Sequence, residues 1–311
     1  MNELASRPAG SDRPLAISLL LGVSGWFAGV FLLAFVALLL RPESAVHAAI
    51  TGAVLLAAAW GLFMAARDGE PVFVAQLALA LSIAGQCLVL YAMTDHASGV
   101  APVAHAALVL QVVLALVMPN RLHRTLSTLF ATIAWALTLH FALLGRDDIW
   151  HRADTLSVAS SLPAALAGWL LTWGPVAAVL GWAIRNEPDW TSRGRAALVR
   201  PIITGLIAGL AFATLASQPF DSLRWLGDTA DTGYLALWPL LSALAALGAL
   251  AAAFALGRRA LMALCVVAAL LHVGHFYYAL GASLLVKSLL MLAMGGALIV
   301  AARVLRLREA A

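Results

Sequence analysis

The side chains best suited to chemistry gather near the carboxyl terminus, in the stretch 272–288, which reads HVGHFYYALGASLLVKS. Gly281 and Ala282 are expected to form a turn between two apolar helices, so residues equidistant from that turn lie at similar depth. Histidine, tyrosine, lysine and serine at one depth could exchange protons or pair with an anion. The stretch therefore predicts a candidate polar site made of His272, His275, Tyr277, Tyr278, Lys287 and Ser288.

Lys287 is the only lysine in a chain that has eighteen arginines. Arginine stays protonated in proteins, whereas a desolvated lysine can lose its proton. The choice of lysine at this position is consistent with an amine that exchanges protons or pairs with an anion. The alternative interpretation is that Lys287, one turn from a helix end, extends its side chain to water.

His272 and His275 are three residues apart and therefore share one face of a helix. A metal ion held by this pair would need further ligands, which His105 or His140 could supply, and a haem between two helical histidines is an equal alternative. The spacing supports neither, and the motifs HExxH, GxSxG, GxxxxGK and the dinucleotide-binding GxGxxG are absent from the sequence. The sequence predicts no metal and no cofactor; His105, His140 and Gln86 remain secondary candidates for the polar site.

The composition excludes an ordinary soluble domain. The chain is 63% hydrophobic and 11% charged, against about 25% charged residues in typical soluble domains. Its mean hydropathy is +0.95. The basic residues are spread over short loops, so membrane topology accounts for the high pI better than nucleic-acid binding does. These features predict an all-α, polytopic bundle of transmembrane helices.

The apolar runs have lengths near 20 residues, which is the length that crosses a hydrocarbon core of about 30 Å. They predict about ten spans, at 15–40, 45–66, 72–93, 101–118, 125–144, 156–184, 201–217, 234–256, 259–279 and 283–303. Residues 15–303 form a single integral domain between short tails, 1–14 and 304–311. The span count also permits two halves, 15–144 and 156–303, of five helices each.

The distribution of arginine orients this bundle. With the amino terminus inside, fourteen arginines fall in cytoplasmic segments and four on the opposite side. Segments retained in the cytoplasm carry excess Lys and Arg, so both termini are expected in the cytoplasm. The longest cytoplasmic connection in this topology is a polar loop at 185–200.

Most of the polar side chains within the spans fall in the outer halves of those spans. Only one histidine, His123, lies on the cytoplasmic side, in a compact turn at 119–124. Ionisable groups in hydrocarbon tend to face cavities or to serve transport, which predicts a polar vestibule open to the outer side. The alternative is that His and Tyr simply favour the membrane interface.

Glycine and proline within the spans predict where helices pack closely or bend. Gly25 and Gly29 make a small-xxx-small face on the first span, which would let another helix approach closely. Pro175 removes a backbone hydrogen bond inside the sixth span, so a kink is expected there.

Two stretches resemble a known bacterial family. They are LLLGVSGWFAGVFLLAFVALLL at 19–40 and YYALGASLLVKSLL at 277–290. On these residues the chain resembles the family catalogued as domain of unknown function 4401, related to the 2157 group. The resemblance implies a bacterial inner-membrane location and, as partner, a small envelope protein with a GDYxxLxY motif. It implies no established activity.

Three classes of function fit the sequence. A permease or transporter subunit with an outer-side polar vestibule accounts for the ten spans and the intramembrane polarity. A non-catalytic envelope partner or scaffold for the GDYxxLxY-type protein is the alternative. A membrane enzyme using Lys287, His272 and His275 is the third class, for which no catalytic motif is present.

Overall fold

The computed structural model describes residues 44–65, 72–94, 100–144, 161–217 and 237–279, together with individual helical residues between 24 and 38 and between 284 and 303. Within these residues the regular structure is helical, and no strand occurs. The helices with assigned bounds are α2 (Ala45–Ala65), α3 (Val72–Thr94), α4 (Val100–Val117), α5 (Arg121–Leu144), α6 (Leu162–Ser192), α7 (Ala196–Ser217), α8 (Leu237–Ala255) and α9 (Arg259–Ala279).

Three of these helices are long and apolar enough to cross a bilayer, by length and composition. They are Ala45–Ala65, Phe73–Thr94 and Leu162–Ser192. Shorter apolar helices accompany them, at Ala101–Val117, Ala196–Phe212, Leu241–Ala255 and Leu261–Gly274. The all-helical fold confirms the predicted class, whereas the number of ten spans and the side on which the termini lie stay predictions.

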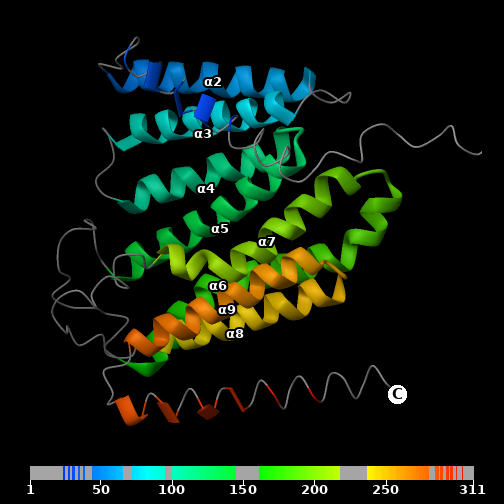
Figure 1. Ribbon diagram of the computed structural model, residues 1–311. Helices are drawn as coiled ribbons and strands as arrows, with labels where there is room; N and C mark the ends of the chain where they lie inside the picture. Colours follow the sequence, from blue (N-terminus) through cyan, green and yellow to red (C-terminus); the bar gives the residue numbers. More distant parts are fainter. Residues whose placement is uncertain are drawn as a thin grey trace, which may run out of the picture.

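The helices follow the chain across the molecule. α2 packs on α3, α3 on α4, and α4 on α5, in a row that Figure 1 shows from top to centre. α7 packs against α5 and also against α6, α8 and α9. It therefore connects the row α2–α5 with the helices α8 and α9. On α7, Ile203 and Ile207 are fully buried, in a core that also includes Trp173 of α6 and Cys265 of α9.

Two glycines end helices through left-handed backbone conformations. Gly194 has φ of 75° and follows α6, and Gly257 has φ of 64° and follows α8. In each turn the next residue closes a hydrogen bond five residues back, from Arg195 N to the carbonyl oxygen of Trp190 (2.9 Å) and from Arg258 N to that of Ala253 (3.1 Å). This is the pattern by which glycine terminates helices. The two turns direct the chain into α7 and α9.

The predicted loop at 185–200 is wrong for most of its length. α6 continues to Ser192, through Pro188, and α7 begins at Ala196. The polar residues of this segment lie on the last turns of α6 and the first turns of α7, because a helix can extend beyond its apolar stretch with its polar side chains in water. α6 also runs through Pro175 as one helix, and the kink there stays a prediction.

Close helix contacts in the structure depend on glycines other than the predicted pair. Gly205 and Gly209, four residues apart on α7, face the threonines of α5: a methyl group added at Gly205 would lie 2.6 Å from the carbonyl oxygen of Thr125, and one at Gly209 would lie 2.7 Å from the Cβ of Thr132. The same holds between α2 and α3, where a methyl group on Gly52 would lie 2.7 Å from the carbonyl oxygen of Gly85. Residues 25 and 29 lie outside the described residues.

Candidate functional site

The predicted polar site near the carboxyl terminus is described only in part. Lys287 lies outside the described residues. The hydroxyl of Ser288 is exposed and donates to the carbonyl oxygen of Leu284 (2.9 Å), a contact within its own helix. α9 carries His275, Tyr277 and Tyr278 near its end, where the side chains lie outside the described residues. The joint site therefore stays a prediction.

His272 is the member of that site whose surroundings are defined. Its side chain is 1% exposed, and its Nε2 lies 2.8 Å from the carbonyl oxygen of Ala211 on α7. Because α7 and α9 pack together, this bond fastens one helix to the other. His272 thus contributes to helix packing in the structure.

The secondary candidates are separated from one another. His105 is exposed on α4, and the side chain of His140 on α5 lies outside the described residues. Gln86 is buried on α3, between helices that Figure 1 shows far from α9. Among the described residues, no group of three or more His, Cys, Asp or Glu side chains is placed to hold a metal ion.

Gln86 belongs instead to a buried polar network between α3, α4 and α5. Its Oε1 accepts from Gln111 Nε2 (2.7 Å), and its Nε2 donates to Ser82 Oγ (3.1 Å). Ser82 Oγ lies 2.6 Å from His123 Nε2, and Ser127 Oγ lies 3.2 Å from His123 Nδ1. All five side chains are no more than 6% exposed, so they form one hydrogen-bonded chain inside the apolar bundle.

One assignment of protons satisfies the contacts of the His123 ring. The Gln86 amide also lies 3.4 Å from His123 Nε2, so that nitrogen faces an N–H donor and acts as an acceptor. The Ser82 hydroxyl then donates to His123 Nε2, and the protonated Nδ1 donates to Ser127 Oγ. At the other end of the network, the buried Oε1 of Gln111 has no hydrogen-bond partner among the described residues.

The position of His123 differs from the one predicted from the sequence. The sequence pattern places it in a turn that faces the cytoplasm, but the structure buries it in the first turn of α5, 1% exposed, with the Phe63 ring edge-on at 5.6 Å. Asn120 Oδ1 accepts from the backbone N–H of His123 (3.1 Å) at the start of the helix. Burial, with a smaller contribution from the charge of Arg124, lowers the pKa of the imidazole to about 4. The imidazole is therefore neutral at pH 7.

The sequence carries a signal for this network. Ser82 and Gln86 are four residues apart, as are His123 and Ser127, and each pair therefore lies on one helical face. The sequence pattern does not show that the start of α5 lies against α3. The sequence pattern indicates a compact turn at 119–124 with His123 facing the cytoplasm, whereas Asn120 is the residue type in it that signals the start of a helix.

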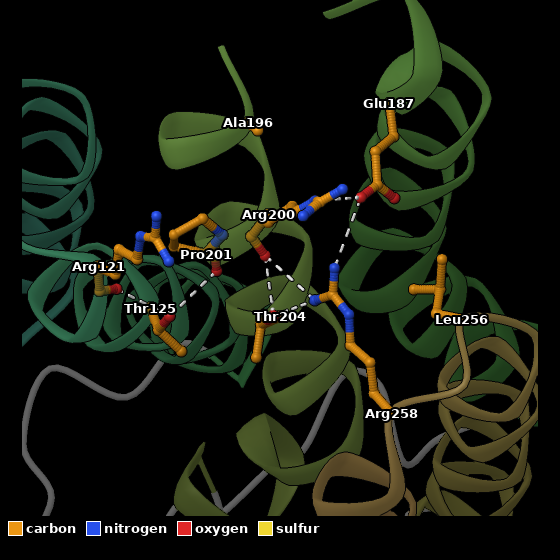
Figure 2. Close-up of a pocket in the computed structure, with 9 residues that line it drawn as sticks. All are labelled: Arg121, Thr125, Glu187, Ala196, Arg200, Pro201, Thr204, Leu256 and Arg258. Atoms are coloured by element: carbon orange, nitrogen blue, oxygen red, sulfur yellow. Dashed lines mark hydrogen bonds and ion pairs between the residues drawn. The ribbon is translucent and has the colours of Figure 1, made fainter. Parts of the chain in front are cut away.

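A second polar site lies where three helix connections meet. A cavity of about 490 Å³ is lined by residues from the start of α5, the end of α6, the start of α7 and the turn between α8 and α9. Figure 2 shows Arg200 at its centre, with Arg121 to one side and Glu187 and Arg258 to the other. In the sequence these arginines indicate only the orientation of the bundle, because their proximity depends on tertiary packing.

One carboxylate oxygen connects two of these arginines. Glu187 Oε1 lies 3.3 Å from Arg200 Nε and 3.6 Å from Arg258 Nη2. Arg258 Nη1 also donates to the carbonyl oxygen of Arg200 (3.3 Å) and to the hydroxyl of Thr204. These contacts hold the α8–α9 turn against α6 and α7.

Comparison with known proteins agrees with the resemblance in the sequence. The model of the family described as "Domain of unknown function (DUF4401)" matches residues 14–229, which is more than half of the chain. The match includes the stretch 19–40 and ends before the stretch 277–290. No curated protein and no solved structure matches the chain. The chain belongs to the domain of unknown function 4401 family.

Proposed function

We propose that the chain is a multi-pass protein of the bacterial inner membrane, with both termini in the cytoplasm, that takes part in moving a polar solute as a permease or transporter subunit. The observation that carries this proposal is the buried network from Gln111 through Gln86 and Ser82 to His123. Polar groups within apolar helices are costly, and in membrane proteins they mark substrate pathways. The distribution of arginine supports the orientation.

The buried Oε1 of Gln111 gives the network an acceptor that has no partner among the described residues. Buried polar atoms usually have hydrogen-bond partners. Ser242 Oγ on α8 also lacks one, so this acceptor supports a pathway only together with the chain of hydrogen bonds that leads to it. Here the chain of hydrogen bonds ends at the side-chain carbonyl oxygen of Gln111, which could accept a hydrogen bond from a water molecule or from a hydroxyl or amine group of a solute. The network therefore offers an acceptor to a ligand inside the bundle.

The chemistry of the network indicates the kind of solute. It consists of two amides, two hydroxyls and one neutral imidazole, so its members offer donors and acceptors but no net charge. Such groups suit an uncharged solute or one recognised through hydrogen bonds. The predicted vestibule around Lys287 would lie nearer the outer side, and its part in the pathway remains a prediction.

Cysteine accessibility tests the proposal without knowledge of the solute. In a background with Cys87 and Cys265 replaced, Ser82→Cys and Gln111→Cys are expected to react with a small hydrophilic methanethiosulfonate reagent in membrane vesicles. A pathway must open to water at least transiently, whereas a packed network stays closed. We expect reaction at least about tenfold faster than at a closed site, which corresponds to about 1.4 kcal/mol in opening free energy.

The matched control is Ser242→Cys in the same background. Ser242 is also fully buried, but on α8 and outside the network. If Ser82→Cys and Gln111→Cys react no faster than Ser242→Cys in protein that accumulates normally, the network is static packing and the transport proposal fails.

A further inference from the structure

The cavity at the meeting point of the three connections gathers charged side chains from several helices. Among its described lining residues are Arg121, Arg200 and Arg258, with Glu187 as the one acidic side chain. Three guanidinium groups and one carboxylate leave two positive charges around the cavity. The three arginines come from α5, α7 and the α8–α9 turn, so the fold brings them together from distant parts of the sequence.

Glu187 neutralises this charge incompletely. It meets both Arg200 and Arg258 through one oxygen, Oε1, at 3.3 and 3.6 Å, rather than through the two parallel hydrogen bonds of a strong arginine–carboxylate pair. Arg200 uses its Nε for this contact. Its two terminal nitrogens have no partner among the described residues.

Arg121 is the arginine with the most unused donors. Its side chain is exposed at the start of α5 and makes no hydrogen bond or ion pair with the described residues. Figure 2 shows it beside Pro201, across Arg200 from the Glu187 carboxylate. Arg121 and Arg200 thus present donors without a described partner from different parts of the cavity lining, Arg121 beside Pro201 and Arg200 toward Glu187.

We propose that this cavity binds the phosphate group of an anionic ligand. The planar fork of arginine donors matches phosphate geometry, and a phosphate dianion would balance the two excess positive charges. A cavity of about 490 Å³ falls in the range of small-ligand pockets and exceeds the need of a bare phosphate ion. The cavity has room for an organic group next to the phosphate, such as a phosphorylated solute and a phospholipid head group both carry. This inference does not depend on the transport proposal.

Ligand titration of the purified full-length protein tests the site. Glycerol 3-phosphate and inorganic phosphate are the soluble probes, added in detergent at constant ionic strength with chloride as the balancing anion. The lipid probe is phosphatidylglycerol in nanodiscs, compared with zwitterionic phosphatidylcholine. Thermal shift reports the soluble probes, and native mass spectrometry reports retained lipid.

Arg121→Gln is the main variant, because the Arg121 side chain makes no hydrogen bond or ion pair with another described residue, so its replacement should leave the fold intact. We expect it to weaken binding of the recognised probe by about tenfold or more, since it removes a charged hydrogen-bond donor to phosphate. Arg200→Gln is the second variant and should act in the same direction. The control is Arg193→Gln, since Arg193 is exposed, pairs with Asp189 (3.1 Å) and does not line the cavity.

The outcomes distinguish the two sources of phosphate. Binding of glycerol 3-phosphate that Arg121→Gln weakens and Arg193→Gln preserves identifies a phosphorylated solute. Selective retention of phosphatidylglycerol with the same dependence identifies a lipid head group. If neither probe distinguishes Arg121→Gln and Arg200→Gln from Arg193→Gln, the proposal is overturned.

Discussion

Replacing Gly209 by alanine is expected to lower the melting temperature of the detergent-purified protein by about 5 to 10 °C, which corresponds to about 2 to 3 kcal/mol of overpacking. The added methyl group would overlap the Oγ1 of Thr132 and lie 2.7 Å from its Cβ. Thr132 cannot turn away, because it is 5% exposed and its hydroxyl donates to the carbonyl oxygen of Leu129 (2.7 Å). α5 and α7 must therefore separate.

Gly205→Ala should act in the same way, since its methyl group would meet the backbone oxygen of Thr125 at 2.6 Å. The control is Gly248→Ala on α8, where nothing lies within 4 Å of the added atom. That change should leave stability unaltered or raise it by up to about 1 kcal/mol through helix propensity. Thr132→Ala should partly rescue Gly209→Ala in a double-mutant cycle. Equal melting temperatures for Gly209→Ala and Gly248→Ala would contradict the close packing of α5 on α7.

Lowering the pH from 7 to 4.5 is expected to reduce the free energy of unfolding by about 2.5 kcal/mol through His123 alone. Burial lowers the pKa of its imidazole from 6.5 to about 4 in the folded protein. Between these two values the unfolded chain binds a proton that the folded protein does not. Stability is therefore fully present above pH 6.5 and is lost progressively as the pH falls toward 4. Chemical or thermal unfolding measured across this range checks the loss.

His123→Gln should flatten this pH profile, because the variant has no group to protonate at that position. It should also be less stable than the native protein at pH 7, by about 1 to 3 kcal/mol, since the hydroxyls of Ser82 and Ser127 lose their ring partner. His105→Gln is the control, because it removes an exposed histidine that lies outside the network. A profile of equal slope in His123→Gln would show that His123 is not the group that titrates.

The sequence by itself determined that the chain is an all-helical bundle of apolar segments and that it belongs to its family. The starts of α2, α3 and α4 were predicted to within a residue, because long apolar runs bounded by polar connections specify helices directly. The end of α6 was not predicted, because that helix is terminated by Gly194 and not by its last apolar residue. A helix needs only its backbone hydrogen bonds to continue, and polar side chains do not interrupt it.

The two polar sites were decided by tertiary structure. Ser82, Gln86, Gln111 and His123 lie on three helices, and hydropathy fixes neither how far one helix is shifted along another nor which face it turns to its neighbour. Close packing between helices sets those quantities; between α5 and α7, for example, the absence of a side chain at Gly209 permits its approach to Thr132. The arginines around Glu187 likewise belong to separate segments of the chain, α5, α7 and the α8–α9 turn. They meet only because α7 packs against α5, α6, α8 and α9. Local sequence sets where helices begin and end, whereas close packing between distant segments sets which polar groups meet.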